Sequence, residues 1–270
     1  MSDMSRSGTP RIIAIANQKG GVGKTTTAIN LAAAMVEEGM RVLLVDLDPQ
    51  GNASTGLGIE AEDREHTTYD LLVDEVELTA VIRQTDLEDL CIIPATVDLS
   101  SADIELFSNE KRSYLLHDAL RQPAMTDYDW DYILIDCPPS LNLLTVNAMV
   151  AADSVLIPLQ SEFFALEGLS QLMLTIREVR HAANPSLRIE GVVLTMYDRR
   201  NNLSQQVEQD ARDNLGDLVF RTKIPRNVRV SEAPSYAMPV LNYDSASLGA
   251  KAYRQLADEI ISKHQRIAAE

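Results

Sequence analysis

The stretch that decides the fold is N-Q-K-G-G-V-G-K-T-T, residues 17–26. It resembles the phosphate-binding pattern G-x-x-x-x-G-K-[ST], in which glycines let successive backbone N–H groups turn toward phosphate oxygens. The pattern expects glycine where this chain has Gln18, and the chain adds a second lysine, Lys19. A phosphate-binding loop is therefore predicted, with one lysine more than the pattern requires.

The flanking residues place this loop between a strand and a helix. R-I-I-A-I-A, residues 11–16, is a short apolar run typical of a strand buried on both faces. Residues 25–38 form a helical pattern that ends at Gly39. The first turn of such a helix favours an anion, because its N–H groups are free and carry partial positive charge.

A nucleotide triphosphate and a magnesium ion fit this arrangement. Lys24 would reach the β- and γ-phosphates, the Thr25 hydroxyl would hold Mg²⁺, and Thr26 would donate to the α-phosphate. Backbone N–H groups would supply the remaining phosphate contacts, from Gly20, Gly21, Val22 and Gly23. A nucleoside triphosphate and Mg²⁺ are thus the cofactors that the loop predicts.

Short apolar runs alternate with helical patterns along the rest of the chain. This order predicts right-handed crossovers and an α/β fold, a parallel, doubly wound sheet flanked by helices on both faces. Ligands in such folds bind beyond the carboxyl ends of the strands. Further strands are expected at residues 42–45, 91–93, 132–135, 154–159 and 191–196, and further helices at 141–151, 165–183, 204–215 and 247–267.

Length and composition predict one domain at residues 11–270, after a flexible polar tail at residues 1–10. No run is long and apolar enough for a signal peptide or a membrane span, so a soluble cytoplasmic protein without membrane contact is expected. Cys91 and Cys137 are expected to be buried reduced thiols rather than metal ligands. The acidic stretch at residues 60–77 is interpreted as a solvated surface segment.

Three aspartates follow predicted strands. Asp46 and Asp48 come just after the second strand, and Asp136 ends the run Y-I-L-I-D. A carboxylate at the end of a buried strand is unfavourable unless it faces a cation or water, so Asp136 is predicted to lie on the Mg²⁺ side of the site. Asp48 is predicted to orient the attacking water, and Asp46 to bond the loop backbone.

Several motifs together resemble one family. K-G-G-V-G-K-T-T is accompanied by D-L-D-P-Q-G-N (46–52), I-D-C-P-P-S (135–140), Q-S-E-F-F-A-L-E-G-L (160–169), T-M-Y-D (195–198) and I-P-R-N-V-R-V-S-E-A-P-S (224–235). This set resembles the deviant Walker A group of P-loop NTPases, and within it the ParA ATPases that segregate bacterial chromosomes and plasmids. The resemblance covers nearly the whole chain, from Ile12 to Ile261.

The resemblance implies a role for the additional lysine. In this family it crosses a dimer interface to the phosphates held by the other subunit, so that two ATP molecules lie between two chains. Lys19, Lys24 and Asp48 are then the catalytic set, and ATP controls a homodimer. The resemblance also implies slow, Mg²⁺-dependent ATP hydrolysis stimulated by a centromere-bound ParB-like partner, and nucleoid association through non-specific DNA binding by the dimer.

Other positions carry the resemblance less directly. Adenine contacts are expected at Met196, Pro225 and Asn227, although ordinary loop packing would also explain these residues. Phe164 and Leu166 are expected in the core or an interface. The family commonly has glycine at the position of Ala237, so a backbone with positive φ would be strained there.

DNA binding needs a local basic surface, because the chain has a formal net charge of −16 and its mean field repels phosphates. Basic residues gather between Asp198 and Val230, where Arg221 and Lys223 also fall, and on the last helix. Scattered surface basics are common, so charge alone leaves this open. The candidate DNA contacts are Arg199, Arg200, Arg226, Arg229, Lys251 and Lys263.

Three other functions remain open from the sequence. A relative that positions a protein cargo on the nucleoid would share every motif above. A membrane-associated spatial regulator resembling MinD would end in an amphipathic basic helix, and I-I-S-K-H-Q-R-I-A-A-E has few bulky apolar groups for that role. An electron-transfer ATPase resembling the nitrogenase iron protein would need cysteine ligands for a cluster, and Cys91 and Cys137 lie in no such motif.

Overall fold

The computed structural model describes residues 9–269 apart from 124, 126–127 and 163–164. The expected tail at residues 1–10 and Phe164 therefore lie wholly or largely outside the described residues, as does the side chain of Leu166. Within the described part of the chain, no helix is long and apolar enough to cross a membrane.

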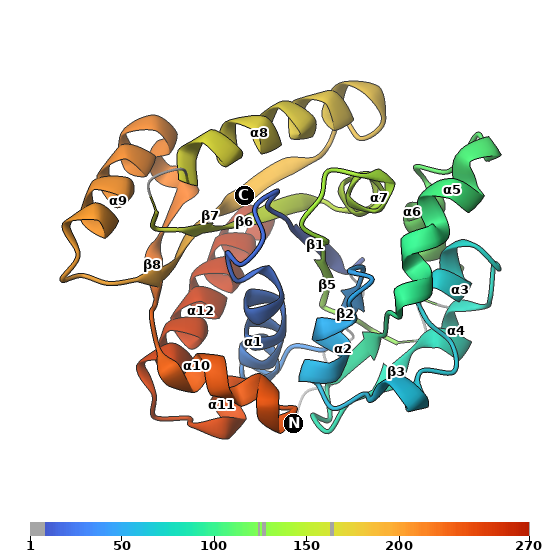
Figure 1. Cartoon of the computed structure of the whole chain (residues 1–270), viewed down its shortest axis with the longest axis horizontal. Coiled ribbons are helices and arrows are strands. Elements are labelled where there is room, and N and C mark those ends of the chain that lie inside the picture. The colour runs from blue at the N-terminus through green and yellow to red at the C-terminus, as the bar shows by residue number, and fades with distance from the viewer. Residues whose placement is uncertain (1–8, 124, 126–127, 163–164, 270) are drawn as a thin grey trace.

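Eight strands form one sheet (Figure 1), and all neighbouring strands are parallel except the antiparallel pair β3–β4. The predicted parallel α/β sheet is confirmed. From one edge to the other the strands are β3 (Arg83–Gln84), β4 (Leu90–Ile93), β2 (Val42–Asp46), β5 (Tyr132–Asp136), β1 (Arg11–Ile15), β6 (Ser154–Gln160), β7 (Arg188–Tyr197) and β8 (Val219–Pro225).

Helices cover both faces of the sheet (Figure 1). On one face α1 (Lys24–Glu37) and α12 (Leu248–Ala269) lie side by side, with α2 (Asn52–Gly56), α10 (Val228–Glu232) and α11 (Val240–Tyr243) around them. The other face carries α3 (Thr68–Leu72), α4 (Leu78–Val81), α5 (Ala102–Glu105), α6 (Leu115–Ala119), α7 (Leu143–Ala151), α8 (Ala165–Ala182) and α9 (Asn202–Leu215).

Short 3₁₀ turns complete the chain. They are η1 (Ala61–Asp63), η2 (Val97–Ser101), η3 (Leu106–Ser108), η5 (Gly216–Leu218) and η6 (Ala233–Tyr236).

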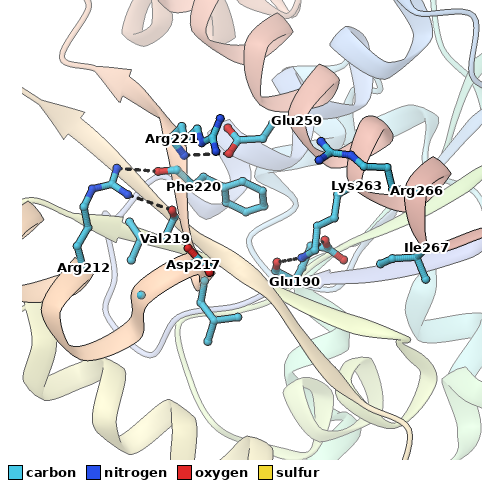
Figure 2. Close-up of a pocket in the computed structure, with 12 residues that line it drawn as sticks. Glu190, Arg212, Asp217, Val219, Phe220, Arg221, Glu259, Lys263, Arg266 and Ile267 are labelled. Atoms are coloured by element: carbon cyan, nitrogen blue, oxygen red, sulfur yellow. Dashed lines mark hydrogen bonds and ion pairs between the residues drawn. The ribbon is translucent and has the colours of Figure 1, made fainter. Parts of the chain in front are cut away.

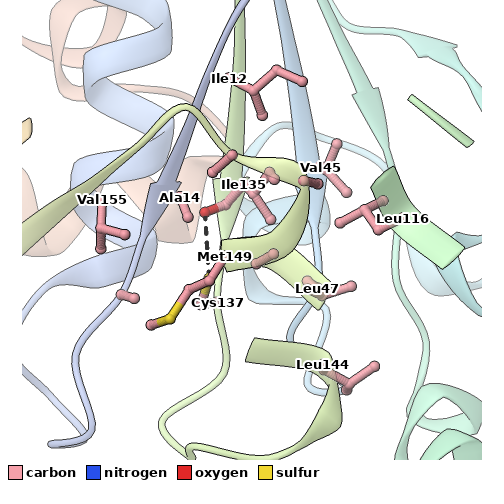
Figure 3. Close-up of a cluster of buried hydrophobic side chains, with 14 of the residues drawn as sticks. Ile12, Ala14, Val45, Leu47, Leu116, Ile135, Cys137, Leu144, Met149 and Val155 are labelled. Carbon is pink, nitrogen blue, oxygen red and sulfur yellow. Dashed lines mark hydrogen bonds between the residues drawn. The ribbon is translucent and has the colours of Figure 1, made fainter. Parts of the chain in front are cut away.

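Alternate residues of each central strand enter two separate cores. In β1, Ile12 and Ala14 pack with α7 under one face (Figure 3), whereas Ile13 and Ile15 pack against α1 and α12. Because both faces are covered, the strands are continuous apolar runs rather than alternating ones. The carboxyl ends of β1, β2 and β5 are thereby held at one edge of the sheet.

The two cysteines lie within this packing, as predicted. Both are free and buried, and Cys137 is drawn in Figure 3 beside the carbonyl of Ile135. Burial raises the pKa of both thiols, so they stay protonated and unreactive at neutral pH.

One surface expectation was wrong in part. Residues 60–77 were expected to be a solvated segment, yet Leu71 and Leu72 are 5% and 2% exposed and belong to the core. The helix α3 that carries them begins at a capping box, in which Thr67 and Asp70 bond each other's backbone N–H groups. The acidic side chains around it masked this short buried helix in the sequence.

Candidate active site

The phosphate loop runs from the end of β1 into α1, as the sequence predicts. Gly21 and Gly23 have φ of 74° and 86°, and Gly23 is the N-cap of α1 without a side-chain cap. Residues with a Cβ are strained at such angles, which explains the two glycines. The N–H groups of the first turn therefore remain available to an anion.

Two neighbouring strands hold the loop. Thr195 Oγ1 in β7 donates to the Val22 carbonyl at 2.8 Å, and Asn17 Nδ2 donates to the Pro158 carbonyl in β6 at 2.7 Å. Asn17 also accepts from the N–H of Lys19 at 3.0 Å. This contact of Thr195 was not predicted from the sequence, although its place in T-M-Y-D at the end of an expected strand was a usable signal.

The two lysines of the loop differ in environment. Lys24 is 6% exposed, and its ammonium donates to the carbonyl of Lys19 at 3.3 Å. Burial lowers the pKa of Lys24, while Asp136, Cys137 and Asp48 oppose that shift. The ammonium of Lys19 instead lies 2.8 Å from Glu162, with 39% and 50% of the two side chains exposed.

Asp136 lies beneath the loop as a fully buried carboxyl group. It pairs in register with Ile15, the last residue of β1, and with Asp46. Neither of its oxygens has a hydrogen-bond partner among the described residues. Burial and then Asp46 raise its pKa well above the usual range, although Thr25 lies close enough to oppose the rise.

Asp46 has the structural role that was predicted for it. Its carboxylate accepts from the N–H of Asp48 at 3.2 Å and from the N–H and hydroxyl of Ser54 at 2.9 and 2.6 Å. Burial raises the pKa of Asp46 to about 6, and these hydrogen bonds oppose the shift. Asp46 thus fixes the loop that follows β2.

Asp48 lies on this fixed loop. It is 7% exposed, and its carboxylate accepts from the N–H of Gln50 at 3.0 Å. Its charge acts on Lys24 and on Asp136, so the three groups share one site. One carboxylate oxygen of Asp48 is therefore fixed by the loop, and the group faces the phosphate loop.

The donor set suits Mg²⁺. Asp136 supplies two unpartnered buried oxygens and Thr25 a neighbouring hydroxyl, which match the preference of Mg²⁺ for oxygen ligands. No group of three or more His, Cys, Asp or Glu residues with metal-binding geometry occurs in the described ranges. Phosphate oxygens and water would therefore complete the coordination.

The expected adenine residues lie at adjacent strand ends. Met196 is the penultimate residue of β7, with φ of 48°, and Pro225 ends β8 opposite Tyr197. Asn227 caps α10 by accepting from the N–H of Val230 at 3.3 Å. Thr195 joins this edge to the phosphate loop, so the region borders the site.

The candidate DNA contacts do not form one patch. Arg199, Arg200 and Arg226 follow β7 and β8 at the carboxyl edge, and Arg200 is paired with Asp198 at 3.0 Å. Arg229 in α10 is paired with Glu232 at 2.9 Å and Asp244 at 3.3 Å. These ion pairs compete with a phosphate for the two guanidinium groups.

The two lysines on α12 are far apart. Lys251 lies in its first turn and Lys263 twelve residues later, which separates them by about 18 Å along the helix. Lys263 is paired at 3.0 Å with Glu190, near the start of β7. It therefore lies near the amino ends of the strands, whereas the other five candidates lie toward the carboxyl ends.

The loop that departs from the family pattern has the strained geometry that its sequence suggests. Ala237 has φ of 53° and ψ of 38°, in the left-handed region. Its N–H donates to the Pro234 carbonyl at 3.1 Å, which closes the 3₁₀ turn η6. A glycine would take this conformation without strain.

Comparisons with known proteins agree with this site. A family model described as an AAA domain matches residues 10–189. The chromosome partitioning protein ParA of Caulobacter vibrioides is 58% identical, over 94% of this chain and 95% of its own. The sporulation initiation inhibitor protein Soj of Bacillus subtilis is 53% identical, over 93% and 98%.

A solved structure shares the fold. The cobyrinic acid a,c-diamide synthase of Mycobacterium smegmatis, with bound ADP and magnesium, has a TM-score of 0.81 and 39% identity, and the match covers 95% of this chain and 96% of that one. Together with the phosphate loop and its acidic neighbours, these similarities identify the chain as a member of the family of ParA and Soj chromosome-partitioning ATPases.

Proposed function

We propose that this chain is an Mg²⁺-dependent ATPase that partitions DNA. One observation carries the assignment: the buried carboxylate of Asp136 has no partner among the described residues, beside Thr25 and Lys24 at the start of α1. Such a group favours a bound cation, and the adjacent helix N-terminus favours the phosphates that bring it. A relative with bound ADP and magnesium supports this choice.

Each residue of the site would have a distinct task. Lys24 binds the β- and γ-phosphates, and the N–H groups of residues 20–26 hold the remaining oxygens. Thr25 and Asp136 hold Mg²⁺, which would neutralise charge developing on the phosphates. Asp48 orients the attacking water, since its second carboxylate oxygen is free for that contact among the described residues.

Lys19 would act on the partner subunit. Its backbone carbonyl accepts a hydrogen bond from the Lys24 ammonium. Among the described residues, its own ammonium is held only by an exposed ion pair with Glu162. A pair exposed to this degree is weak, so Lys19 can exchange Glu162 for the γ-phosphate of a second chain. ATP would then favour the dimer, and slow hydrolysis would return the monomer.

The ATP-bound dimer would bind DNA without sequence preference in the cytoplasm, on the nucleoid, and a ParB-like centromere-binding protein would stimulate hydrolysis. The 58% identity to the chromosome partitioning protein ParA of Caulobacter vibrioides, over nearly its whole length, supports these partners. The relative at 39% identity carries a different enzyme name, and the relative at 58% identity favours partitioning instead.

Two alternatives are less well supported. A MinD-like membrane role needs a free apolar face on the last helix, but the apolar face of α12, with Tyr253, Leu256 and Ile260, is buried against the core. An iron-protein role needs accessible thiols, and Cys91 and Cys137 are buried. A protein cargo in place of DNA would leave the ATPase assignment unchanged.

DNA binding of Asp48→Ala protein tests the proposal. Binding to unrelated duplex DNA would be measured with ATP or ADP across a salt series. We expect sequence-independent binding that requires ATP for full affinity and weakens steeply with salt. An ATP-bound dimer without DNA affinity would refute the partitioning role and leave the ATPase intact.

A further inference from the structure

A groove of about 600 Å³ lies at the amino edge of the sheet (Figure 2), and none of the residues that line it belongs to the phosphate loop. The turn η5 and the start of β8 form one wall, the second half of α12 forms the other, and Glu190 of β7 lies between them. We call it the amino-edge groove. Strands β7 and β8 run from this groove toward the carboxyl edge, where Thr195 contacts the phosphate loop.

The backbone of the edge strand is already bonded in this groove. Glu259 accepts from the N–H groups of Arg221 and Thr222 at 2.9 and 3.1 Å (Figure 2). Arg212 donates to the carbonyls of Val219 and Phe220 at 3.3 and 3.1 Å. The groove therefore cannot accept an added β-strand, which argues against an extended peptide as its occupant.

Most acids of the groove are also occupied. Glu190 is 4% exposed and accepts from Ser154 at 2.7 Å, Lys263 at 3.0 Å and His264 at 3.0 Å. Burial alone would raise its pKa, but these hydrogen bonds and the charges of His264 and Lys263 lower it to about 2. The carboxylate of Glu259 accepts hydrogen bonds from two backbone N–H groups, as described above. Of the three acidic side chains that line the groove, Asp217 alone makes no hydrogen bond or ion pair with the described residues.

Two guanidinium groups of the groove lack acidic partners. Arg221 and Arg266 are exposed on opposite walls, and no ion pair holds either side chain among the described residues. The only hydrogen bond of the Arg266 side chain in that part of the chain runs to the Ser262 carbonyl at 3.2 Å. A second groove of about 290 Å³ shares Lys263 and adds Arg188. Arginines without acidic partners among the described residues, namely Arg221, Arg266 and Arg188, thus extend over two adjoining grooves, in a chain with a net charge of −16.

We propose that the amino-edge groove binds phosphates of the duplex DNA backbone through Arg221 and Arg266. The inference rests on the proposed function and assigns part of its DNA surface. Guanidinium groups bind phosphate through two parallel hydrogen bonds, and the adjoining grooves provide room for successive phosphates. No residue that lines the groove belongs to the phosphate loop, so ATP would raise DNA affinity by joining two copies of the groove in the dimer.

The test compares two double variants with equal charge change. Arg221→Gln/Arg266→Gln alters the groove, and Arg177→Gln/Arg180→Gln alters exposed arginines on α8. Duplex DNA binding would be measured across a salt series in both nucleotide states, with ATP turnover as the check of folding. The groove variant should bind duplex DNA about tenfold more weakly. Its slope of log affinity against log salt concentration should fall by about one for each lost contact, that is, by about two per chain. The α8 variant should behave as wild type.

Three results would overturn the proposal. Wild-type affinity and slope in the groove variant would overturn the groove alone, provided that the wild type binds DNA. A wild type that binds no duplex would overturn the groove together with the proposed function. Competition by polyglutamate as effective as DNA of equal charge would show that the groove does not select phosphates.

Discussion

The ammonium of Lys19 lies 2.8 Å from a carboxylate oxygen of Glu162 in the same chain. The pair joins the additional lysine of the phosphate loop to the loop after β6, and both side chains are substantially exposed. An exposed pair of this kind contributes about 1 kcal/mol or less to folding. Glu162→Gln should therefore leave the free energy of unfolding within about 1 kcal/mol of wild type in urea denaturation. A larger loss would mean that the pair stabilises the monomer and does not exchange readily.

Lys24→Ala should lose nucleotide affinity. A charge-assisted hydrogen bond to phosphate contributes about 1.5–3 kcal/mol, so ADP binding should weaken by about 10- to 100-fold in calorimetric titration. Lys19→Ala is the matched control, because its ammonium faces Glu162 and not the nucleotide of its own chain. Equal losses in both variants would contradict the division of roles between the lysines.

Asp136→Asn should change how the stability of the folded chain depends on pH. Burial raises the pKa of Asp136, so the folded chain holds a proton there more tightly than the unfolded chain. Wild-type stability therefore falls as pH rises from the ordinary carboxyl range through the raised pKa, and the variant lacks this loss. Without nucleotide, the Tm of the variant relative to wild type should increase with pH.

The same variant should respond less to ligand. Mg²⁺ and ADP together should raise its Tm less than they raise that of wild type, because a carboxylate ligand is missing. An equal rise in both proteins would remove Asp136 from the metal site.

Asp48→Ala should retain ATP binding and lose turnover. Removal of a group that orients the attacking water lowers the rate by about 10²- to 10⁴-fold. Phosphate release would be measured beside Asp86→Ala, which removes an exposed carboxylate elsewhere. Turnover at the wild-type rate in Asp48→Ala would show that another group positions the water.

Ala237→Gly should stabilise the protein. The left-handed backbone at φ of 53° strains alanine, and relief of this strain should raise the free energy of unfolding by about 0.5–1 kcal/mol. Ala233→Gly is the control of opposite sign, because Ala233 is buried, begins the turn η6 with φ of −50°, and has no strain to relieve. Destabilisation by both substitutions would show that the Ala237 methyl group packs favourably.

Much of the fold could be predicted because central strands of a doubly covered sheet are apolar throughout. All six expected strands are present, with bounds shifted by a few residues. Strand β8 was missed, since its polar residues, such as Arg221 and Lys223, belong to an exposed sheet edge and interrupt the apolar run. The two-residue strand β3 is too short to leave a pattern in the sequence.

The candidate site, like the fold, could be predicted only in part from the sequence. Lys24, Thr25 and Asp136 were predictable, because a loop motif and strand ends fix their positions locally. The bond from Thr195 to Val22 spans 173 residues and depends on the strand order, which no local pattern contains. For the same reason the sequence grouped Lys263 with arginines that lie at the other edge of the sheet.

In the proposed dimer, Lys24 binds the nucleotide of its own chain and Lys19 binds that of its partner. Light scattering of Asp48→Ala and of Lys19→Ala/Asp48→Ala, each with Mg²⁺ and ATP, tests it most directly. We predict twice the monomer mass for the single variant and the monomer mass for the double variant, with ATP bound to both. A double variant that still dimerises with ATP would contradict the account.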